Sequence, residues 1–503
     1  MNHYAIGIGG TGAKCIEALI HLSAAGLMPK GELYVLFVDP DKGNGNIDRA
    51  AITLQRYIDL KRIQLGAVDF LKTNISEAKP NVWSPFENEA QPTLDKFFQY
   101  NELRESNKAA THLFDVLYSP SEKATTLEKG FRGHPSIGAA VMAETVRLGQ
   151  GEPWGTFRNR IIQDIRGGTG ARIFLFGSIF GGTGASGFPT IATLIRKELA
   201  ELQQNNQNVP QQENMKLGGM LAMPYFSFLY ESQDTEMKAK SENFLINTHT
   251  GLKYYYHKTY SNIYDAIYSC GDETQSLVST ASLGGNTQKN EPHFVELYAA
   301  LSAITFFSEK DPSGFNLIAR KQLNQLDWID LPDGKVGTAI KQKIGQLTRF
   351  AFSYLSVYYP MLKAIRENER AYRAPWFIDF FARENISLNN TQTSLDDLKA
   401  FCEDFLLWVA NLHNSAKEEK INLINWNAFA HVVKEKDGKE KVKLLPSFRL
   451  KDFGNLILPS GKEKPNELSR LWEMVCDSKV RDSNSVGIGK FIHALYRESY
   501  LKE

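Results

Sequence analysis

The sequence has few cysteines, no long apolar run and no segment typical of export. It contains four cysteines, Cys15, Cys270, Cys402 and Cys476. They are scattered and form no C-x-x-C pair, which excludes a disulfide framework and predicts reduced thiols. No apolar stretch approaches the roughly 20 residues that span a bilayer, and the first residues lack the basic segment of a secretory signal. We therefore expect a cytoplasmic protein without a membrane partner.

An excess of either charge is also missing. The 58 Lys and Arg residues balance 57 Asp and Glu residues, so the chain lacks the net positive charge typical of a general nucleic-acid binder. The motifs G-x-x-x-x-G-K-[ST], H-E-x-x-H and G-x-S-x-G are absent, and the ten histidines are dispersed. We expect no nucleic-acid partner and no metal site built from protein ligands alone.

Glycine, by contrast, occurs in a repeated pattern. The pentapeptide Gly-Gly-Thr-Gly-Ala occurs three times, at 9–13, 167–171 and 181–185. The outer copies follow apolar runs at 4–8 and 173–179 and precede helical patterns at 14–25 and 189–202. In such a strand–turn–helix unit, free backbone N–H groups and the positive end of the helix dipole face an anion, usually phosphate. No helical pattern follows the middle copy, which we predict to be a plain turn.

Short apolar runs that alternate with helical patterns predict an α/β fold with a parallel sheet flanked by helices. We expect strands at 4–8, 33–38, 173–179, 217–223 and 263–270. The segment 292–307 is apolar on nearly all sides, which predicts a fully buried helix. Further helices are expected at 338–366, 394–417, 466–476 and 489–498, and a hairpin tip at 434–443.

These patterns predict three parts. Residues 1–290 form a nucleotide-binding α/β domain, in which the polar segment 50–129 is a helical insertion. Residues 291–310 form a central helix, and residues 311–503 form a C-terminal domain that is mostly helical.

Two stretches carry the chemistry. Residues 7–12 match G-x-G-x-x-G and are followed by Asp39 at the end of the next strand, which by itself indicates dinucleotide binding. Residues 181–187 hold four glycines interleaved with Thr183 and Ser186, more glycine than a turn with one or two positive φ angles requires. Two such turns predict one nucleotide held from two sides.

The denser stretch resembles a known family. Residues 180–187, Phe-Gly-Gly-Thr-Gly-Ala-Ser-Gly, resemble the glycine-rich signature with which the tubulin/FtsZ superfamily clasps the phosphates of GTP. Residues 9–14 are similar to the first phosphate loop of that family, and 37–41, Phe-Val-Asp-Pro-Asp, resemble the loop after its second strand. Residues 130–138 are similar to the γ-phosphate-sensing loop of FtsZ, and 292–307 resemble the central helix. The chain is most similar to divergent bacterial tubulin-like proteins.

The resemblance implies GTP or GDP, with Mg²⁺, as the bound cofactors. It implies base contacts at Asn243 and Asp272, and it places Asp41 toward the water shell of the magnesium ion. The phosphates would be bound or sensed by Gly9, Gly10, Thr11, Gly12, Ala13, Lys14, Asp39, Gly133, His134, Gly181, Gly182, Thr183, Gly184, Ala185 and Ser186.

The family also implies head-to-tail assembly of identical subunits into filaments, with nucleotide state controlling the contact. In the family, acids that follow the central helix of one subunit complete GTP hydrolysis on the next subunit. Here the family's spacing Asn-x-Asp-x-x-Asp/Glu is not kept. Glu309 and Asp311 are the first candidates for these acids, and 324–330, Asn-Gln-Leu-Asp-Trp-Ile-Asp, is a second.

Two other functions stay open. The lost catalytic spacing favours a non-hydrolysing nucleotide sensor or scaffold, which would recruit a protein partner through 50–129 or the C-terminal region. The stretch 7–12 with Asp39 favours an NAD- or FAD-dependent oxidoreductase, but that function leaves 181–187 unexplained.

Overall fold

The computed structural model describes most of the chain. The described residues are 1–84, 86, 93–127, 130–131, 134–148, 152–205, 215–228, 241–255, 263–272, 275–278, 285, 288–318, 325–331, 337–367, 374–415, 420–436, 440–458, 467–480 and 484–501. None of the helices within them is both long and apolar enough to cross a membrane.

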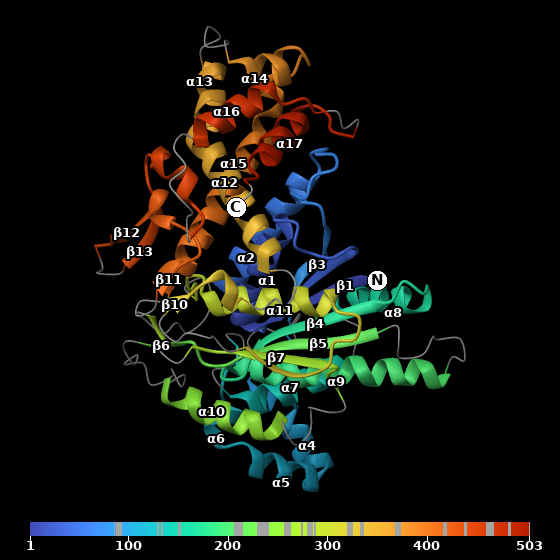
Figure 1. The fold of residues 1–503 in the computed structure, drawn as a ribbon. Helices are drawn as coiled ribbons and strands as arrows, with labels where there is room; N and C mark the ends of the chain where they lie inside the picture. The colour runs from blue at the N-terminus through green and yellow to red at the C-terminus, as the bar shows by residue number, and fades with distance from the viewer. Residues whose placement is uncertain are drawn as a thin grey trace.

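A parallel sheet forms the centre of the molecule (Figure 1). Seven described strands pair in the order β3-β2-β1-β4-β5-β7-β9, and every pair is parallel. Their bounds are β1 Asn2–Ile8, β2 Glu32–Val38, β3 Asn74–Trp83, β4 Ala171–Ser178, β5 Met215–Ala222, β7 Ala266–Cys270 and β9 Gly314–Leu317. Strand β1 lies between β2 and β4, and its Ala5 pairs with Val35 and Phe174. The five strands expected from apolar runs are therefore confirmed.

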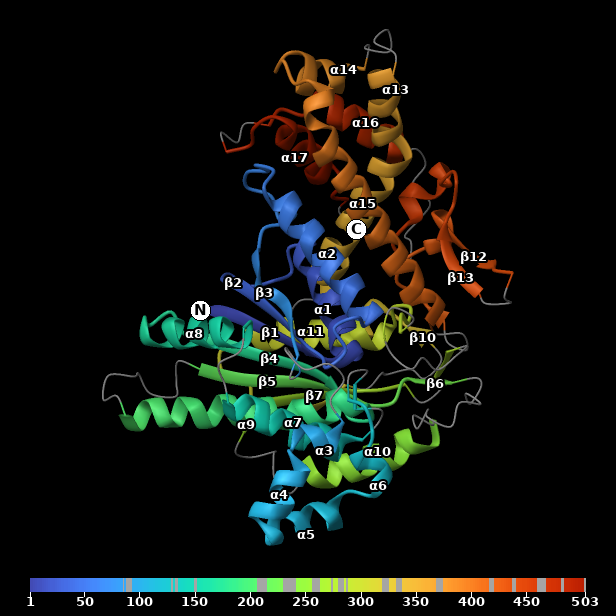
Figure 2. The ribbon, with the colours of Figure 1, turned by 180° about the vertical axis from the view of Figure 1, so that it is seen from behind.

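Helices cover both faces of the sheet. One face carries α1 (Gly9–Ala24), α2 (Gly45–Lys61) and α11 (Phe294–Ser308). The other carries α7 (Pro135–Leu148) and α9 (Gly182–Asn205), with α10 (Ser241–Tyr254) beyond its edge, as both ribbon views show (Figures 1 and 2). The α/β class is thus confirmed, and the apolar segment 292–307 is the buried helix α11.

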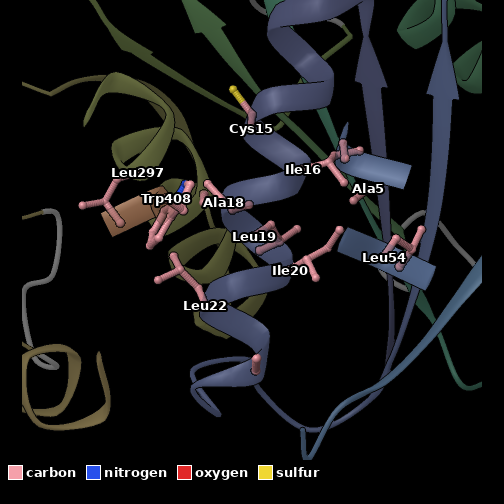
Figure 3. Packing of buried hydrophobic residues seen from close by; sticks show 14 of the residues in the cluster. Ala5, Cys15, Ile16, Ala18, Leu19, Ile20, Leu22, Leu54, Leu297 and Trp408 are labelled. Atoms are coloured by element: carbon pink, nitrogen blue, oxygen red, sulfur yellow. The ribbon is translucent and has the colours of Figure 1, made fainter. Parts of the chain in front are cut away.

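Helix α1 is enclosed on every side (Figure 3). All its residues from Gly12 to Ala24 are buried. Figure 3 shows its apolar side chains between Ala5 of β1, Leu54 of α2 and Leu297 of α11, with Trp408 beyond. Trp408 belongs to α15 (Leu388–Ser415) of the C-terminal region. The N-terminal and C-terminal parts therefore share one hydrophobic core.

The separate helical segment of the structure is shorter than the insertion predicted at 50–129. The first part of that predicted insertion holds α2 and the edge strand β3, which belong to the main domain. An edge strand keeps one side next to solvent, so the polar β3 lacks the apolar run that indicates an inner strand. The separate part contains α3 Leu94–Phe97, α4 Tyr100–Ser106, α5 Lys108–Leu117 and α6 Pro120–Lys123.

The C-terminal region is mostly helical, as predicted. A long helix runs from α12 (Gly337–Ser353) through a π-helical segment (Tyr354–Tyr358) into α13 (Tyr359–Glu367). It packs with α15, α16 (Glu467–Asp477) and α17 (Ile488–Glu498). The boundary at 311 shifts, because β9 follows α11 and still belongs to the main sheet.

A hairpin confirms the charged turn predicted at 434–443. Strands β12 (Ala430–Lys434) and β13 (Glu440–Leu444) pair antiparallel, with Lys434 opposite Glu440. The tip, 437–439, lies outside the described residues.

Candidate functional site

Two of the glycine-rich turns meet at the centre of the sheet. From β1 the chain proceeds to β2 and β3 on one side, and from β4 it proceeds to β5 and β7 on the other. The carboxyl ends of β1 and β4 therefore form the switch point of the topology, where open parallel sheets bind ligands. The turn at 9–13 follows β1, and the turn at 181–185 follows β4.

Both turns are the first turns of helices. Helix α1 begins at Gly9, whose φ is +72°, and α9 begins at Gly182. The sequence predicted later starts, at 14 and 189, because glycine has a low helix propensity. Within the described residues, no side chain caps α1, and neither helix has an acid in its first turn. The free N–H groups and the positive helix ends are thus left for a ligand.

The two turns touch each other. A β-carbon on Gly9 would lie 3.4 Å from the β-carbon of Thr183. Glycine is required at the two positions that lie against β4, because β-carbons on Gly12 and Gly184 would lie 2.6 Å from backbone atoms of that strand. Partly exposed positions line the surface of the pair: Gly10, Thr11, Gly181, Thr183 and Ala185. The remaining predicted positions, Ala13, Gly182 and Ser186, are buried.

Ser186 has a structural partner. Its hydroxyl donates to the carbonyl of Gly182 at 2.7 Å and is 1% exposed. The side chain packs against Gly138 of α7. The structure therefore gives Ser186 a role in joining α9 to α7, rather than the phosphate contact that the sequence predicted.

The third loop lies beside the second turn. A β-carbon on Gly130 would lie 3.7 Å from Thr183 Oγ1. His134 precedes α7, is partly exposed, and its Nδ1 lies 3.4 Å from Glu122 Oε1 of α6. Gly133 lies outside the described residues. The structure thus brings three of the four predicted loops together.

The acids of the fourth loop, after β2, are buried and bind groups of the protein. The Asp41 N–H donates to Asp39 Oδ1 at 2.9 Å, and the Asn44 amide donates to Asp39 Oδ2 at 3.2 Å. Burial nevertheless raises the pKa of the Asp39 carboxyl to about 7. Asp41 accepts from the Gly43 N–H at 3.1 Å and from the Gly285 N–H at 2.6 Å. Both acids therefore bind backbone N–H groups of the protein.

Lys14, which the resemblance places among the phosphate contacts, is buried. It is 3% exposed, and its Nζ lies 2.5 Å from Glu296 Oε1 in the first turn of α11. The Tyr225 hydroxyl donates to the same carboxylate oxygen at 2.9 Å, and Tyr225 also forms a hydrogen bond with the Thr11 side chain. Because Glu296 is also buried, the ammonium is needed to balance its charge. Lys14 therefore stabilises the first turn through its ion pair with Glu296.

The two predicted base contacts, Asn243 and Asp272, lie in different surroundings. Asn243 lies in the first turn of α10, near the second turn, because Phe244 of that helix packs on Phe180 with ring centres 4.8 Å apart. Asp272 is 3% exposed and lies beside His293, with Oδ2 3.7 Å from Nε2. The structure thus places Asp272 beside the residue that caps α11, and its contact with guanine stays a prediction.

The middle copy of the pentapeptide is a turn, as predicted. It follows α8 (Trp154–Arg166) at the amino end of β4, and Gly168 and Gly170 have φ angles of +75° and +78°. Thr169 between them is exposed. This copy lies at the opposite edge of the sheet from the other two.

The candidate catalytic acids also lie at that opposite edge. Glu309 and Asp311 follow the end of α11 and are exposed. Asp311 pairs with Lys216 at the start of β5, at 2.6 Å. Since α11 begins near the glycine turns and its 15 residues extend about 22 Å, these acids cannot reach a ligand on the same subunit.

The second candidate for the acids is structural. The Asp327 N–H donates to Asp330 Oδ2 at 2.9 Å, and the Asn422 amide donates to Asp327 Oδ1 at 2.7 Å. Both carboxylates therefore hold the short helical turn at Trp328–Asp330. Asn324 lies outside the described residues.

Comparison with models of known protein families and with curated protein sequences gives no match. What the site can bind therefore follows from its own geometry. Its surface offers backbone N–H donors and two positive helix ends, which suit a phosphate-bearing ligand. Among the described residues, no group of three or more His, Cys, Asp or Glu side chains is placed to hold a metal ion.

Sequence reasoning missed Asn46 at the first turn, beside Asn44, whose side chain caps α2. A β-carbon on Gly10 would lie 3.0 Å from Asn46 Nδ2 and 3.2 Å from Asn44 Nδ2. Both residues begin α2, and both are 2% exposed. The sequence signal was Asn-Gly-Asn directly after the acids of the second loop, which by itself indicates only a turn.

Proposed function

We propose that this chain is a cytoplasmic nucleotide-binding protein of the tubulin/FtsZ type that holds GTP or GDP at the switch point of its sheet. The observation that supports this most is the contact between the glycine turns after β1 and β4, through Gly9 and Thr183. Each turn begins a helix without an acid in its first turn. Two helix ends that converge in this way favour the several charges of a di- or triphosphate.

Magnesium fits the proposal as an ion carried by the phosphates. Mg²⁺ keeps most of its water and needs only one or two carboxylates from a protein. Asp41 lies in the loop that follows β2, and its carboxylate oxygens retain lone pairs beyond the two N–H groups that they accept. Bound Mg²⁺ would neutralise phosphate charge, while Asp41 would orient water.

The position of Asp39 weakens the oxidoreductase alternative. In dinucleotide-binding folds the acid after the second strand accepts a hydrogen bond from a ribose hydroxyl. Here both carboxylate oxygens of Asp39 already accept hydrogen bonds from the protein, and the residue is 3% exposed. The second turn and the loop around Gly130 add donors that a dinucleotide site does not need.

The arrangement of the two edges of the sheet supports head-to-tail assembly as part of the proposal. The glycine turns lie at one edge, and the exposed Glu309 and Asp311 lie at the other. A second copy stacked on the first would bring these acids to the nucleotide, where a carboxylate can orient the attacking water. Such a contact joins different surfaces and does not close, so it produces a filament.

The ion pair of Asp311 with Lys216 supports a second candidate function, a sensor or scaffold that does not hydrolyse GTP. An acid held by a lysine is a weaker base than a free one. The helices α3–α6 would recruit the partner, because this segment is tied to the third loop by the contact of Glu122 with His134.

The direct test is to identify the nucleotide that co-purifies with the full chain by chromatography, and to titrate nucleotide-free protein with GTP, GDP, ATP and NAD⁺ by calorimetry. Tight binding of guanine nucleotides alone supports the proposal, whereas binding of NAD⁺ alone or of no nucleotide contradicts it. Sedimentation and electron microscopy with GTP, GDP and a non-hydrolysable analogue then test assembly. Identical oligomers in all three states would rule out nucleotide control.

A further inference from the structure

Asn46 presents its side-chain amide to the first glycine turn. It lies in the first turn of α2, where its backbone N–H donates to Asn44 Oδ1 at 3.0 Å. The residue as a whole is 2% exposed. Its Nδ2 lies 3.0 Å from the position that a β-carbon on Gly10 would occupy. The amide nitrogen therefore faces the start of α1.

The orientation of this amide is fixed by its oxygen. Asn46 Oδ1 accepts the backbone N–H of Asn290 at 2.8 Å, and a backbone N–H can only donate. The segment that carries Asn290 is held in turn by Arg49, whose Nη1 donates to the Asn290 carbonyl at 2.7 Å. The amide cannot be flipped without losing this bond, so Nδ2 must point toward Gly10.

Within the described part of the chain, Asn46 Nδ2 has no hydrogen-bond acceptor. The neighbouring Asn44 differs, because its Nδ2 donates to Asp39 Oδ2 at 3.2 Å and to Gln288 Oε1 at 3.3 Å. The fully buried side-chain atoms of the described residues that lack a hydrogen-bond partner do not include this nitrogen, so it reaches the surface beside Gly10 and is open to a ligand. Such a donor beside a ligand-binding turn points to an acceptor that the ligand supplies.

We propose that Asn46 is a ligand-binding residue whose Nδ2 donates a hydrogen bond to a phosphate oxygen held at the first glycine turn. This inference rests on the proposed nucleotide site and extends it toward β2. The groups that would share the oxygen are the free N–H groups of the first turn of α1 and the Asn46 amide, and all of them are donors. Only an oxygen that accepts several hydrogen bonds satisfies them together, which suits phosphate.

The test is the isosteric variant Asn46→Asp in the full chain, titrated with GDP by calorimetry at pH 7.5. Asp keeps the acceptor for the Asn290 N–H and places an oxygen where the donor was. Removal of a hydrogen bond to a charged group lowers affinity about 10- to 100-fold, and the added charge lowers it further. Unfolding of the unliganded variant should stay close to that of the wild type, because an acid suits the first turn of α2.

Asn44→Ser is the matched control. Serine keeps the cap of α2, and Asn44 has no donor left for a ligand, so GDP affinity should change less than threefold. A loss in Asn44→Ser equal to that in Asn46→Asp would overturn the inference, because the fold of the loop would then control binding. If the wild type binds GDP and Asn46→Asp binds it equally well, the inference fails while the nucleotide site stands. If the wild type binds no nucleotide, the nucleotide site itself fails.

A pH series separates ligand contact from a structural role. Protonation of the new carboxyl group restores a donor, so the affinity of Asn46→Asp relative to the wild type should rise as the pH falls from 7.5 to 5. Dividing the affinity of the variant by that of the wild type at each pH cancels the effect of protonation of GDP itself. A ratio that stays constant over this range would contradict direct contact with the phosphate.

Discussion

The three copies of one pentapeptide allow the same substitution to be made at a proposed phosphate turn and at a plain turn. Thr183 is the second residue of α9 and contacts the first turn, whereas Thr169 holds the same place in the middle copy at the other edge of the sheet. We predict that Thr183→Asp abolishes nucleotide binding and that Thr169→Asp leaves it unchanged.

The magnitude follows from Coulomb's law. A carboxylate at position 183 would lie about 5 Å from a phosphate between the turns, and at an effective dielectric constant near 20 each pair of unit charges then costs about 3 kcal/mol. Affinity should fall at least ~100-fold, since 1.4 kcal/mol corresponds to a factor of ten. Thr169 is separated by the length of β4, whose eight residues extend about 26 Å, well beyond the screening length of ~8 Å at physiological salt.

Stability should move in the opposite direction to affinity. An acid in the first turn of α9 interacts favourably with the helix dipole, by about 0.3–1 kcal/mol, so Thr183→Asp should unfold at the same or a higher denaturant concentration. Thr183→Val removes the hydroxyl without adding charge and should bind more tightly than Thr183→Asp, because it loses only a hydrogen bond to a charged group, which is worth about 1.5–3 kcal/mol. Calorimetry and urea unfolding measure both quantities. Binding by Thr183→Asp within threefold of the wild type, or an equal loss in Thr169→Asp, would refute the phosphate site.

Three further outcomes are expected. Burial lowers the pKa of His21 to about 3, so as the pH drops below about 6.5 the unfolded state takes up a proton first and the free energy of unfolding falls. His21→Leu should remove about 2 kcal/mol of this fall between pH 7 and 5, as measured by urea unfolding at both pH values. Lys14→Met alone should cost about 3–5 kcal/mol because it leaves Glu296 buried and unpaired, and the double variant with Glu296→Gln should recover part of that loss in a double-mutant cycle. Joint replacement of Glu309 and Asp311 by their amides should lower GTP turnover without changing GTP affinity; unchanged turnover would favour the sensor.

Inner strands and turns could be predicted, because they depend on local composition. Residues 4–8 and 173–179 are apolar throughout, since a strand inside a covered parallel sheet is buried on both faces. The glycine turns could be found for a similar reason, because four glycines within 181–187 exceed what a plain turn requires. Two such turns predicted one ligand held from two sides, and the strand order places both turns at the switch point.

Features that depend on distant partners could not be predicted. Strands β3 and β9 lie at the two edges of the sheet and lack an apolar run. Lys14 follows a glycine turn in sequence, yet its charge is taken by Glu296, which is 282 residues away (296 − 14). Asn46 became a candidate only when Asn290 fixed the direction of its amide. Each of these features depends on residues that are far apart in the sequence, so no local sequence pattern predicts it.

The position of β1 inside the sheet has a consequence for the order in which the protein is made. This strand is synthesised before the other strands of the sheet, but its neighbour β4 begins only at Ala171, and the helix α15 that covers α1 begins only at Leu388. At about 5–20 residues per second, the N-terminal strand waits on the order of ten seconds for β4 and longer for α15. The apolar faces of β1 and α1 are therefore exposed on the nascent chain for most of its synthesis. Nucleotide cannot assist this early stage, because the second half of its binding site has not yet been translated.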